Sequence, residues 1–275
     1  MVNIQPLHGV IVPIIIPLDQ QGAVDHKSFK QVIKHLVSRQ IHGVILHTEC
    51  KDAAKLASSE LEELILTAGI ALGEASFIVG IAPETTRTVV QHIKSLKALG
   101  ADAVLVAPPY SPFENCNSFI RYFLTLAEAE LPIILHNRPQ RNGEALELSA
   151  LQPIMELDHM IGVVEGTGSI RRLFQLSRGL AKPVLSSRDD LFFSSLCCGT
   201  SGGLVTSAHA DSELFVHTYE LYRSGKIDEA KQLFDQLLPL IQFIHSESSL
   251  APLKWLLAER GLISSGLPVS SSMPV

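Results

Sequence analysis

The sequence predicts one α/β domain, a (β/α)8 TIM barrel with a C-terminal helical extension. Two observations predict it: eight short, continuously apolar segments recur along the 275 residues, and amphipathic segments lie between them. Continuously apolar strands are typical of parallel sheets that are covered on both faces. Eight strand-then-helix units indicate the barrel. A doubly wound open sheet is the alternative, but no GxGxxG motif follows the first strand.

The expected strands follow one another at regular intervals. They are 9–16, 43–47, 77–81, 103–107, 132–136, 161–164, 183–187 and 202–206. The clearest intervening helices are 25–40, 58–73 and 85–100, and the last two end at glycine, a common helix stop.

Three further helical patterns follow the eighth strand, over 211–225, 226–246 and 251–261. This is more helix than one barrel unit needs. We therefore assign residues 1–210 to the barrel through strand 8. Residues 211–275 form the last barrel helix and a C-terminal helical extension, packed as part of the same domain.

Composition narrows the function classes. Hydrophobic residues make up 46% of the chain and charged residues 18%, which is enough apolar material for a large core. The net charge is −6 and no basic patch occurs, so nucleic acid is not an expected partner. The longest apolar run, 10–18, is too short to cross a membrane, and Pro13 and Pro17 interrupt it.

The N-terminal residues do not show the pattern of a signal peptide, and the four cysteines show no CxxC spacing. A reduced, cytoplasmic protein is therefore expected. Cys197 and Cys198 fall on a predicted helix, where we interpret them as packing residues.

Reacting groups of TIM barrels lie at the C-terminal ends of the strands. The polar residues expected there, in strand order, are His47, Thr48, Glu49, Cys50 and Lys51; Tyr110 and Ser111; His136, Asn137, Arg138 and Arg141; Glu165 and Thr167; Ser186, Ser187 and Arg188; Thr206 and Ser207.

Five stretches, in this order and spacing, resemble the dihydrodipicolinate synthase / N-acetylneuraminate lyase family of class I pyruvate aldolases. They are GADAVLVAPPY (100–110), LPIILHNRPQRNG (131–143), IGVVEGTG (161–168), GTSGGLVTSAHA (199–210) and APLKWLLAERGL (251–262). The resemblance implies a TIM barrel with a helical appendage, a homo-oligomer (tetramer or dimer), and lyase or synthase chemistry on a keto acid.

The family reaction uses three devices. A lysine at the end of strand 6 forms a Schiff base with pyruvate, a tyrosine after strand 5 transfers protons, and a threonine-rich turn after strand 2 binds the carboxylate. The resemblance places Val164 at the lysine, His136 at the tyrosine, and Glu49 and Cys50 at the two threonines. A further family tyrosine falls on Ser111.

Other positions keep the family residue or a polar side chain. Arg141 aligns with an arginine that binds a substrate carboxylate, and Asn137 and Tyr110 are retained. Thr206 follows the eighth strand. We expect these four residues, with Glu49 and Cys50, to line a site for a small carboxylate or keto-acid ligand, without a metal or other cofactor.

Valine has no nucleophilic atom, so no Schiff base can form at Val164. The sequence therefore predicts a degenerate family member without Schiff-base aldolase activity. His136 is the candidate acid/base, because the pKa of imidazole lies near neutral pH. The plain alternatives are a packed valine and a hydrogen-bonded structural histidine.

Two other functions stay open. One is an active carbon–carbon lyase or synthase in which the amine of Lys51, or a metal bound with His136, replaces the Schiff-base lysine. His47, Glu49, Cys50, His136 and Glu165 are all metal-binding types, although strand alternation turns Glu165 away if residue 164 points inward. The other is a proton-transfer or hydrolytic reaction run by His136 with Glu49.

Overall fold

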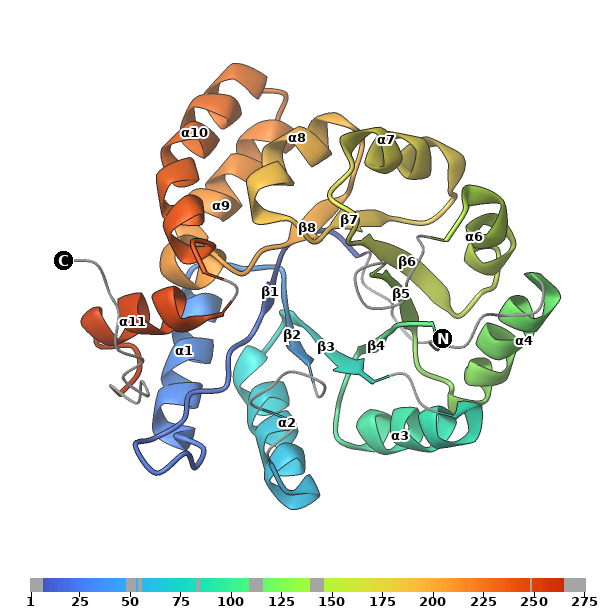
Figure 1. The fold of residues 1–275 in the computed structure, drawn as a ribbon, viewed down its shortest axis with the longest axis horizontal. Coiled ribbons are helices and arrows are strands. Elements are labelled where there is room, and N and C mark those ends of the chain that lie inside the picture. Colours follow the sequence, from blue (N-terminus) through green and yellow to red (C-terminus); the bar gives the residue numbers. More distant parts are fainter. Residues whose placement is uncertain are drawn as a thin grey trace.

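The protein is described by a computed structural model over residues 7–47, 53, 56–82, 85–108, 116–138, 146–247 and 249–264. Each strand pairs in parallel with the next, and β8 pairs with β1, which closes the barrel. The strands are β1 (Gly9–Pro13), β2 (Gly43–His47), β3 (Ser76–Ile81), β4 (Ala103–Val106), β5 (Ile133–Asn137), β6 (Met160–Glu165), β7 (Val184–Ser186) and β8 (Gly202–Leu204). The predicted TIM barrel is confirmed, and Figure 1 shows the helices around the central strands.

Helices follow the strands and cover the outside of the barrel. They are α1 (His26–Ser38), α2 (Ser58–Leu72), α3 (Thr86–Ala98), α4 (Cys116–Leu126), α6 (Leu148–Met155), α7 (Ile170–Gly179), α8 (Phe192–Cys197) and α9 (Ala208–Arg223), with the short 3-10 helices η2 (Ala127–Ala129) and η3 (Asp189–Leu191). Side-chain caps set two of the starts: Asp25 accepts a hydrogen bond from the backbone N–H of Ser28, and Thr85 accepts one from that of Thr88.

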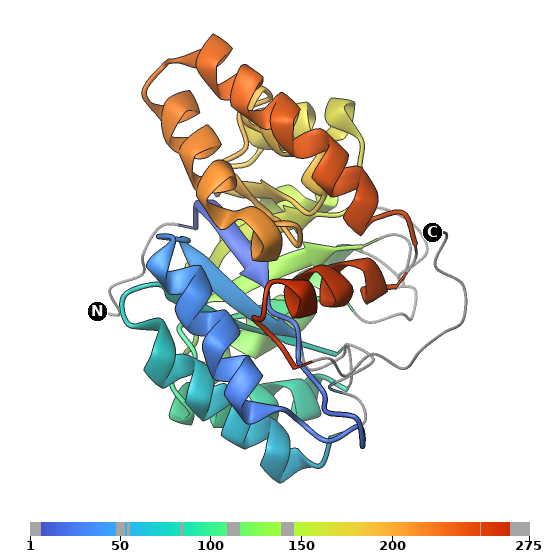
Figure 2. The same cartoon turned by 90° about the vertical axis from the view of Figure 1, so that its left-hand side faces the viewer.

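The C-terminal extension consists of α10 (Ile227–Ile244) and α11 (Ala251–Glu259), which pack against α9 outside the barrel (Figure 2). The helix expected over 211–225 begins three residues earlier, at Ala208, and its backbone leaves the helical conformation at Asp211. Of the helices that the structure describes, none combines the length and the apolar character needed to span a membrane.

Strand alternation divides the apolar core into two layers. The inner layer fills the barrel and consists of Leu7, Ile11, Ile45, Ile78, Ala103, Leu105, Ile134, Val164, Leu185 and Leu204. The larger outer layer lies between the strands and the helices, and it contains Val163. Val164 therefore faces the barrel interior, and Glu165 faces outward, as alternation along a strand requires.

Three further expectations from the sequence differ from the structure. The first strand ends at Pro13 instead of residue 16, because proline removes a donor from the ladder. The eighth strand ends at Leu204, where a turn toward α9 begins. Cys197 is exposed at the end of α8, so the packing interpretation is wrong for it, whereas the partly buried Cys198 does contact the outer layer.

The closure of the barrel depends on glycine. A Cβ on Gly202 would lie 2.1 Å from the carbonyl oxygen of Gly9, which is closer than any side chain tolerates. Only a residue without a side chain allows β8 and β1 to approach this closely.

Candidate functional site

The inner faces of β5 and β6 bring His136 and Val164 together. The two residues are register partners across the strands, and both are buried, with 4% and 0% of their surface exposed. The ring of His47, at the end of β2, lies 5.9 Å from that of His136, centroid to centroid. Two of the residues predicted for the site are thus neighbours, and His47 joins them.

A glycine on β3 makes room for this arrangement. A Cβ on Gly80 would lie 2.5 Å from Nδ1 of His47, so any larger residue would displace the imidazole. The direction of His47 was open from the sequence alone. The structure turns it toward the interior, beside His136.

The outer faces of the same two strands carry a buried polar network. Asn137 pairs with Glu165 across β5 and β6, and its Nδ2 donates to Oε2 of Glu165 at 2.6 Å. The Nε of Arg172, from α7, donates to the same oxygen at 3.0 Å, and the N–H of Thr167 donates to Oε1 at 2.8 Å. Glu165 is 1% exposed, and these donors satisfy its charge inside the protein.

The network also holds the backbone of Leu146. Its N–H donates to Oδ1 of Asn137 at 3.3 Å, and its carbonyl accepts from Nη2 of Arg172. Both ends of the Asn137 amide are therefore used on the outer side of the barrel. A ligand contact by this side chain would have to displace one of these hydrogen bonds.

The turn after β8 is also held by hydrogen bonds to buried side chains. Thr206 is partly exposed there, and its N–H donates to Oδ1 of Asp189 at 3.1 Å. Nδ1 of His209 lies 2.9 Å from the carbonyl oxygen of Thr206. The backbone N–H of Ile15, beyond β1, donates to Nε2 of His209 at 3.3 Å. Both backbone polar groups of Thr206 are thus fixed by side chains.

These contacts assign the tautomer of His209. Nε2 accepts a backbone N–H, so Nδ1 carries the proton that is donated to Thr206, and the ring is neutral. Burial lowers the pKa of His209 to about 4. The backbone bond to Thr206 and the charge of Asp189 act in the opposite direction but are weaker.

Acid is therefore expected to destabilise the protein through His209. His209 binds a proton near pH 6.5 in the unfolded chain but only near pH 4 in the folded one, so the stability that this group contributes is complete above pH 6.5 and is lost as pH falls toward 4. The loss amounts to about 3 kcal/mol for this group. Denaturant unfolding between pH 7 and pH 4.5 measures it. His209→Gln should flatten the pH dependence, whereas the exposed His92→Gln should leave it unchanged.

Sequence reasoning missed three of the organising residues: Arg172, Asp189 and His209. Arg172 lies seven residues after Glu165, in the first turn of the next helix. This proximity in the sequence was a signal that could have identified it as the partner of the buried carboxylate. Asp189 directly follows Arg188, which was among the predicted strand-end residues. His209 gave no signal, because its partners come from the segment after β1 and from its own turn.

Several predicted site residues lie outside the described residues. They are Lys51, Glu49, Cys50, Tyr110, Ser111 and Arg141. Within the described ranges, no three side chains of histidine, cysteine, aspartate or glutamate lie together in a group fit to hold a metal ion. His47 and His136 supply two such side chains.

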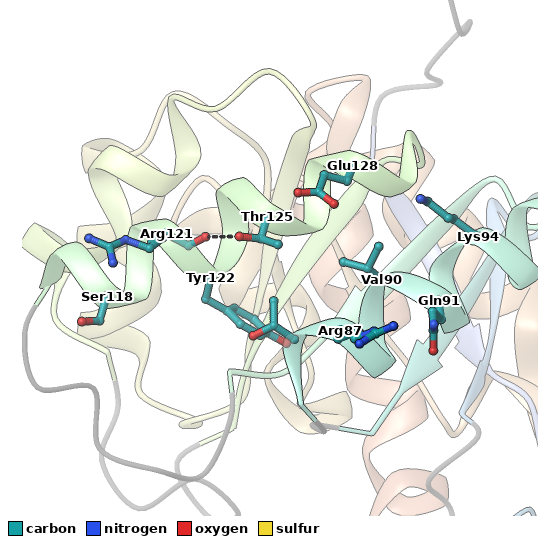
Figure 3. A pocket seen from close by; sticks show the side chains of 10 residues that line it. Arg87, Val90, Gln91, Lys94, Ser118, Arg121, Tyr122, Thr125 and Glu128 are labelled. Carbon is teal, nitrogen blue, oxygen red and sulfur yellow. Dashed lines mark hydrogen bonds between the residues drawn. The ribbon is translucent and has the colours of Figure 1, made fainter.

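The cavities lined by described residues lie elsewhere. One groove of about 640 Å³ runs between α3 and α4. Figure 3 shows that the side chain of Arg121 extends away from those of Arg87 and Lys94, so the three cationic side chains of this groove do not converge on one point. Another cavity, of about 850 Å³, opens at the N-terminal end of the barrel beside His8 and His42. That end of a TIM barrel normally serves stability.

A family model described as "Dihydrodipicolinate synthetase family" matches residues 6–273. The chain is similar to a 4-hydroxy-tetrahydrodipicolinate synthase of Methanosphaerula palustris, with 27% identity over 94% of this chain and 91% of the relative. Among solved structures, it resembles a dihydrodipicolinate synthase of Acinetobacter baumannii in complex with pyruvate, with a TM-score of 0.87, 25% identity, and coverage of 98% and 94%.

An N-acetylneuraminate lyase of Fusobacterium nucleatum, also with pyruvate, has a TM-score of 0.84 at 18% identity, over 93% of this chain and 88% of that one. At that identity the likeness concerns the fold alone.

Proposed function

Because this chain belongs to the dihydrodipicolinate synthetase family, we propose that it is a member without Schiff-base aldolase activity that binds a small carboxylate metabolite. It retains the barrel and part of the family site. We further infer a homo-oligomer, tetramer or dimer, in the cytoplasm. Exposed apolar pairs on α2 (Leu66, Ile70) and α7 (Ile170, Phe174) support self-association.

The observation that carries the proposal is the environment of Val164. The resemblance places this residue where the family has its lysine, at the end of β6. Its side chain is fully buried in the inner apolar layer, beside His136 and Leu185 on the neighbouring strands. Formation of an imine requires an amine at the keto carbon, and a valine provides none.

A role in ligand binding is supported by polar groups at the C-terminal ends of β2 and β5 and after β8. His136 and His47 present two imidazoles to the interior, and Thr206 stands at the mouth with a fixed backbone. We propose that Arg141 pairs with the ligand carboxylate, since a guanidinium binds it through two parallel hydrogen bonds. Glu49, Cys50 and Tyr110 are the further proposed ligand residues. The sequence also predicted Asn137, but its side chain is engaged in the outer network, so we do not propose it as a ligand residue.

Trapping with pyruvate and sodium borohydride tests the proposal directly. We expect the intact mass of the protein to stay unchanged, while a lysine-dependent pyruvate aldolase in the same experiment gains the reduced adduct. Titration calorimetry with pyruvate, run in parallel, separates a protein that binds without reacting from one that does not bind. A reduced adduct on any lysine would contradict the proposal.

One alternative has specific support. The 5.9 Å separation of the His47 and His136 rings places two acid/base groups together, which suits an active lyase or synthase with rearranged catalytic groups. In that case the amine of Lys51, or a metal held with His136, replaces the Schiff-base lysine. Peptide mapping of a trapped adduct decides it: an adduct on Lys51 that is lost in Lys51→Gln but kept in Lys55→Gln supports this alternative.

A further inference from the structure

A buried carboxylate connects the last helices of the chain to the barrel mouth. Asp189, in η3 after β7, is 4% exposed and accepts four hydrogen bonds. One comes from Thr206 N–H at 3.1 Å, and two come from the N–H and Oγ of Ser207, both at 2.6 Å. The fourth partner is Nε2 of His245, at 3.0 Å.

His245 caps the C-terminal end of α10, so it belongs to the helical extension and not to the barrel. Its side chain is 48% exposed, while that of Asp189 is 3% exposed. A helix C-terminus carries partial negative charge and favours a protonated histidine. The contact therefore joins a titratable surface group to a carboxylate that organises the mouth.

We propose that Asp189 is the positioning residue for the turn that carries Thr206, and that His245 secures Asp189, so that the C-terminal extension sets the order of the barrel mouth in a pH-dependent manner.

The two carboxylate oxygens of Asp189 accept hydrogen bonds from different donors. Oδ1 accepts from Thr206, and Oδ2 accepts from three donors, two of Ser207 and one of His245. A buried carboxylate that loses its donors is strongly penalised. The turn and α10 are thus bound to the same group, and movement of either one disturbs the other.

The charges around His245 favour this pairing. The segment after β7 contributes Arg188, Asp189 and Asp190, and Arg188 forms a two-pronged ion pair with Asp190 at 3.0 and 2.8 Å. Asp190 is thereby engaged, and Asp189 is left as the hydrogen-bonding partner. From the turn after β8, His209 faces Asp189 as a neutral ring.

Protonation of His245 is favoured in the folded state. The hydrogen bond to Asp189 raises the pKa of His245; burial lowers it, and the charges of Asp189 and Asp190 raise it further. A raised folded pKa means that the stabilisation is complete below pH 6.5 and is lost as pH rises through the folded value. The turn should accordingly be most ordered in mild acid.

Hydrogen exchange at the backbone amides of Thr206 and Ser207 tests the proposal, because these N–H groups donate to Asp189. After correction for intrinsic chemistry, we expect protection in the wild type to be several-fold greater at pH 6 than at pH 8. His245→Gln should abolish this difference. His217→Gln, at an exposed histidine on α9, should retain it. Asp189→Asn should accelerate exchange at both amides about tenfold or more.

Two results would overturn the proposal: a wild type whose protection does not change with pH, or a His245→Gln variant that behaves as the wild type does. If Asp189→Asn fails to fold, the ring titration of His245 in the wild type decides, since a midpoint at or below the ordinary histidine value of about 6.5 contradicts the pairing. None of these measurements requires a ligand or turnover, so they are independent of the proposed function.

Discussion

Replacing Val164 with lysine, the residue that the resemblance assigns to this position, is not expected to produce Schiff-base chemistry. The new amine would enter the inner apolar layer at a position with no exposed surface. We expect no trapped pyruvate adduct, because the resemblance places Glu49 and Cys50 at the turn that binds the pyruvate carboxylate in the family, and a carboxylate there would repel a second one. Borohydride trapping of the variant measures this. An adduct on residue 164 would show that only the nucleophile was lost.

The same substitution should lower the free energy of unfolding by about 3 to 5 kcal/mol at pH 7, because a charged ammonium loses its hydration in the core. Val164→Met is the matched control, since it adds a similar length without the charge. Burial lowers the pKa of a lysine, so stability should recover as pH rises from 7 toward 10. Denaturant unfolding of both variants over that range follows the difference, and a pH-independent gap would contradict this account.

Loss of the Arg172 guanidinium should have a comparably large effect on stability. Arg172→Met leaves the carboxylate of Glu165 buried with one donor fewer and removes the bond to the Leu146 carbonyl. Breaking a buried ion pair by removing one partner costs about 3 to 5 kcal/mol. Urea or guanidinium unfolding of the variant measures the loss.

The neighbouring arginine provides the control. Arg171 is exposed on the same helix, and Arg171→Met should change stability by less than about 0.5 kcal/mol. In a double-mutant cycle, Glu165→Gln combined with Arg172→Met should be less harmful than the sum of the two single changes. Additive losses would show that the two side chains do not act as a pair.

The fold was predictable because it depends on local patterns. Continuous apolar strands and amphipathic helices recur in order, and each unit is short enough to be recognised by itself. Boundaries were less certain where proline or glycine alters the ladder, as at Pro13 and after Leu204. Alternation along β6 also gave the opposite directions of residues 164 and 165, because a strand fixes side-chain direction with a period of two.

The site was only partly predictable, for a physical reason. Strand ends indicate which polar residues gather at the mouth, so His136 and its neighbour His47 were among the candidates, whereas Val164 was singled out only by the family resemblance. The groups that hold the mouth are distant in sequence: Asp189 and His245 are 56 residues apart, and His209 is 194 residues from Ile15. Such pairs become visible only after the chain has closed on itself.

The division of β5 and β6 into two faces has an evolutionary consequence. His136 and Val164 point inward, whereas Asn137 and Glu165, one residue further along each strand, anchor the outside. Substitutions at the inner positions can therefore change the reacting groups, while the outer hydrogen-bond network continues to stabilise the barrel. A lineage can lose one reaction and acquire another on this scaffold without passing through an unfolded ancestor. In the laboratory, libraries of uncharged residues confined to these inner positions should yield mostly folded proteins.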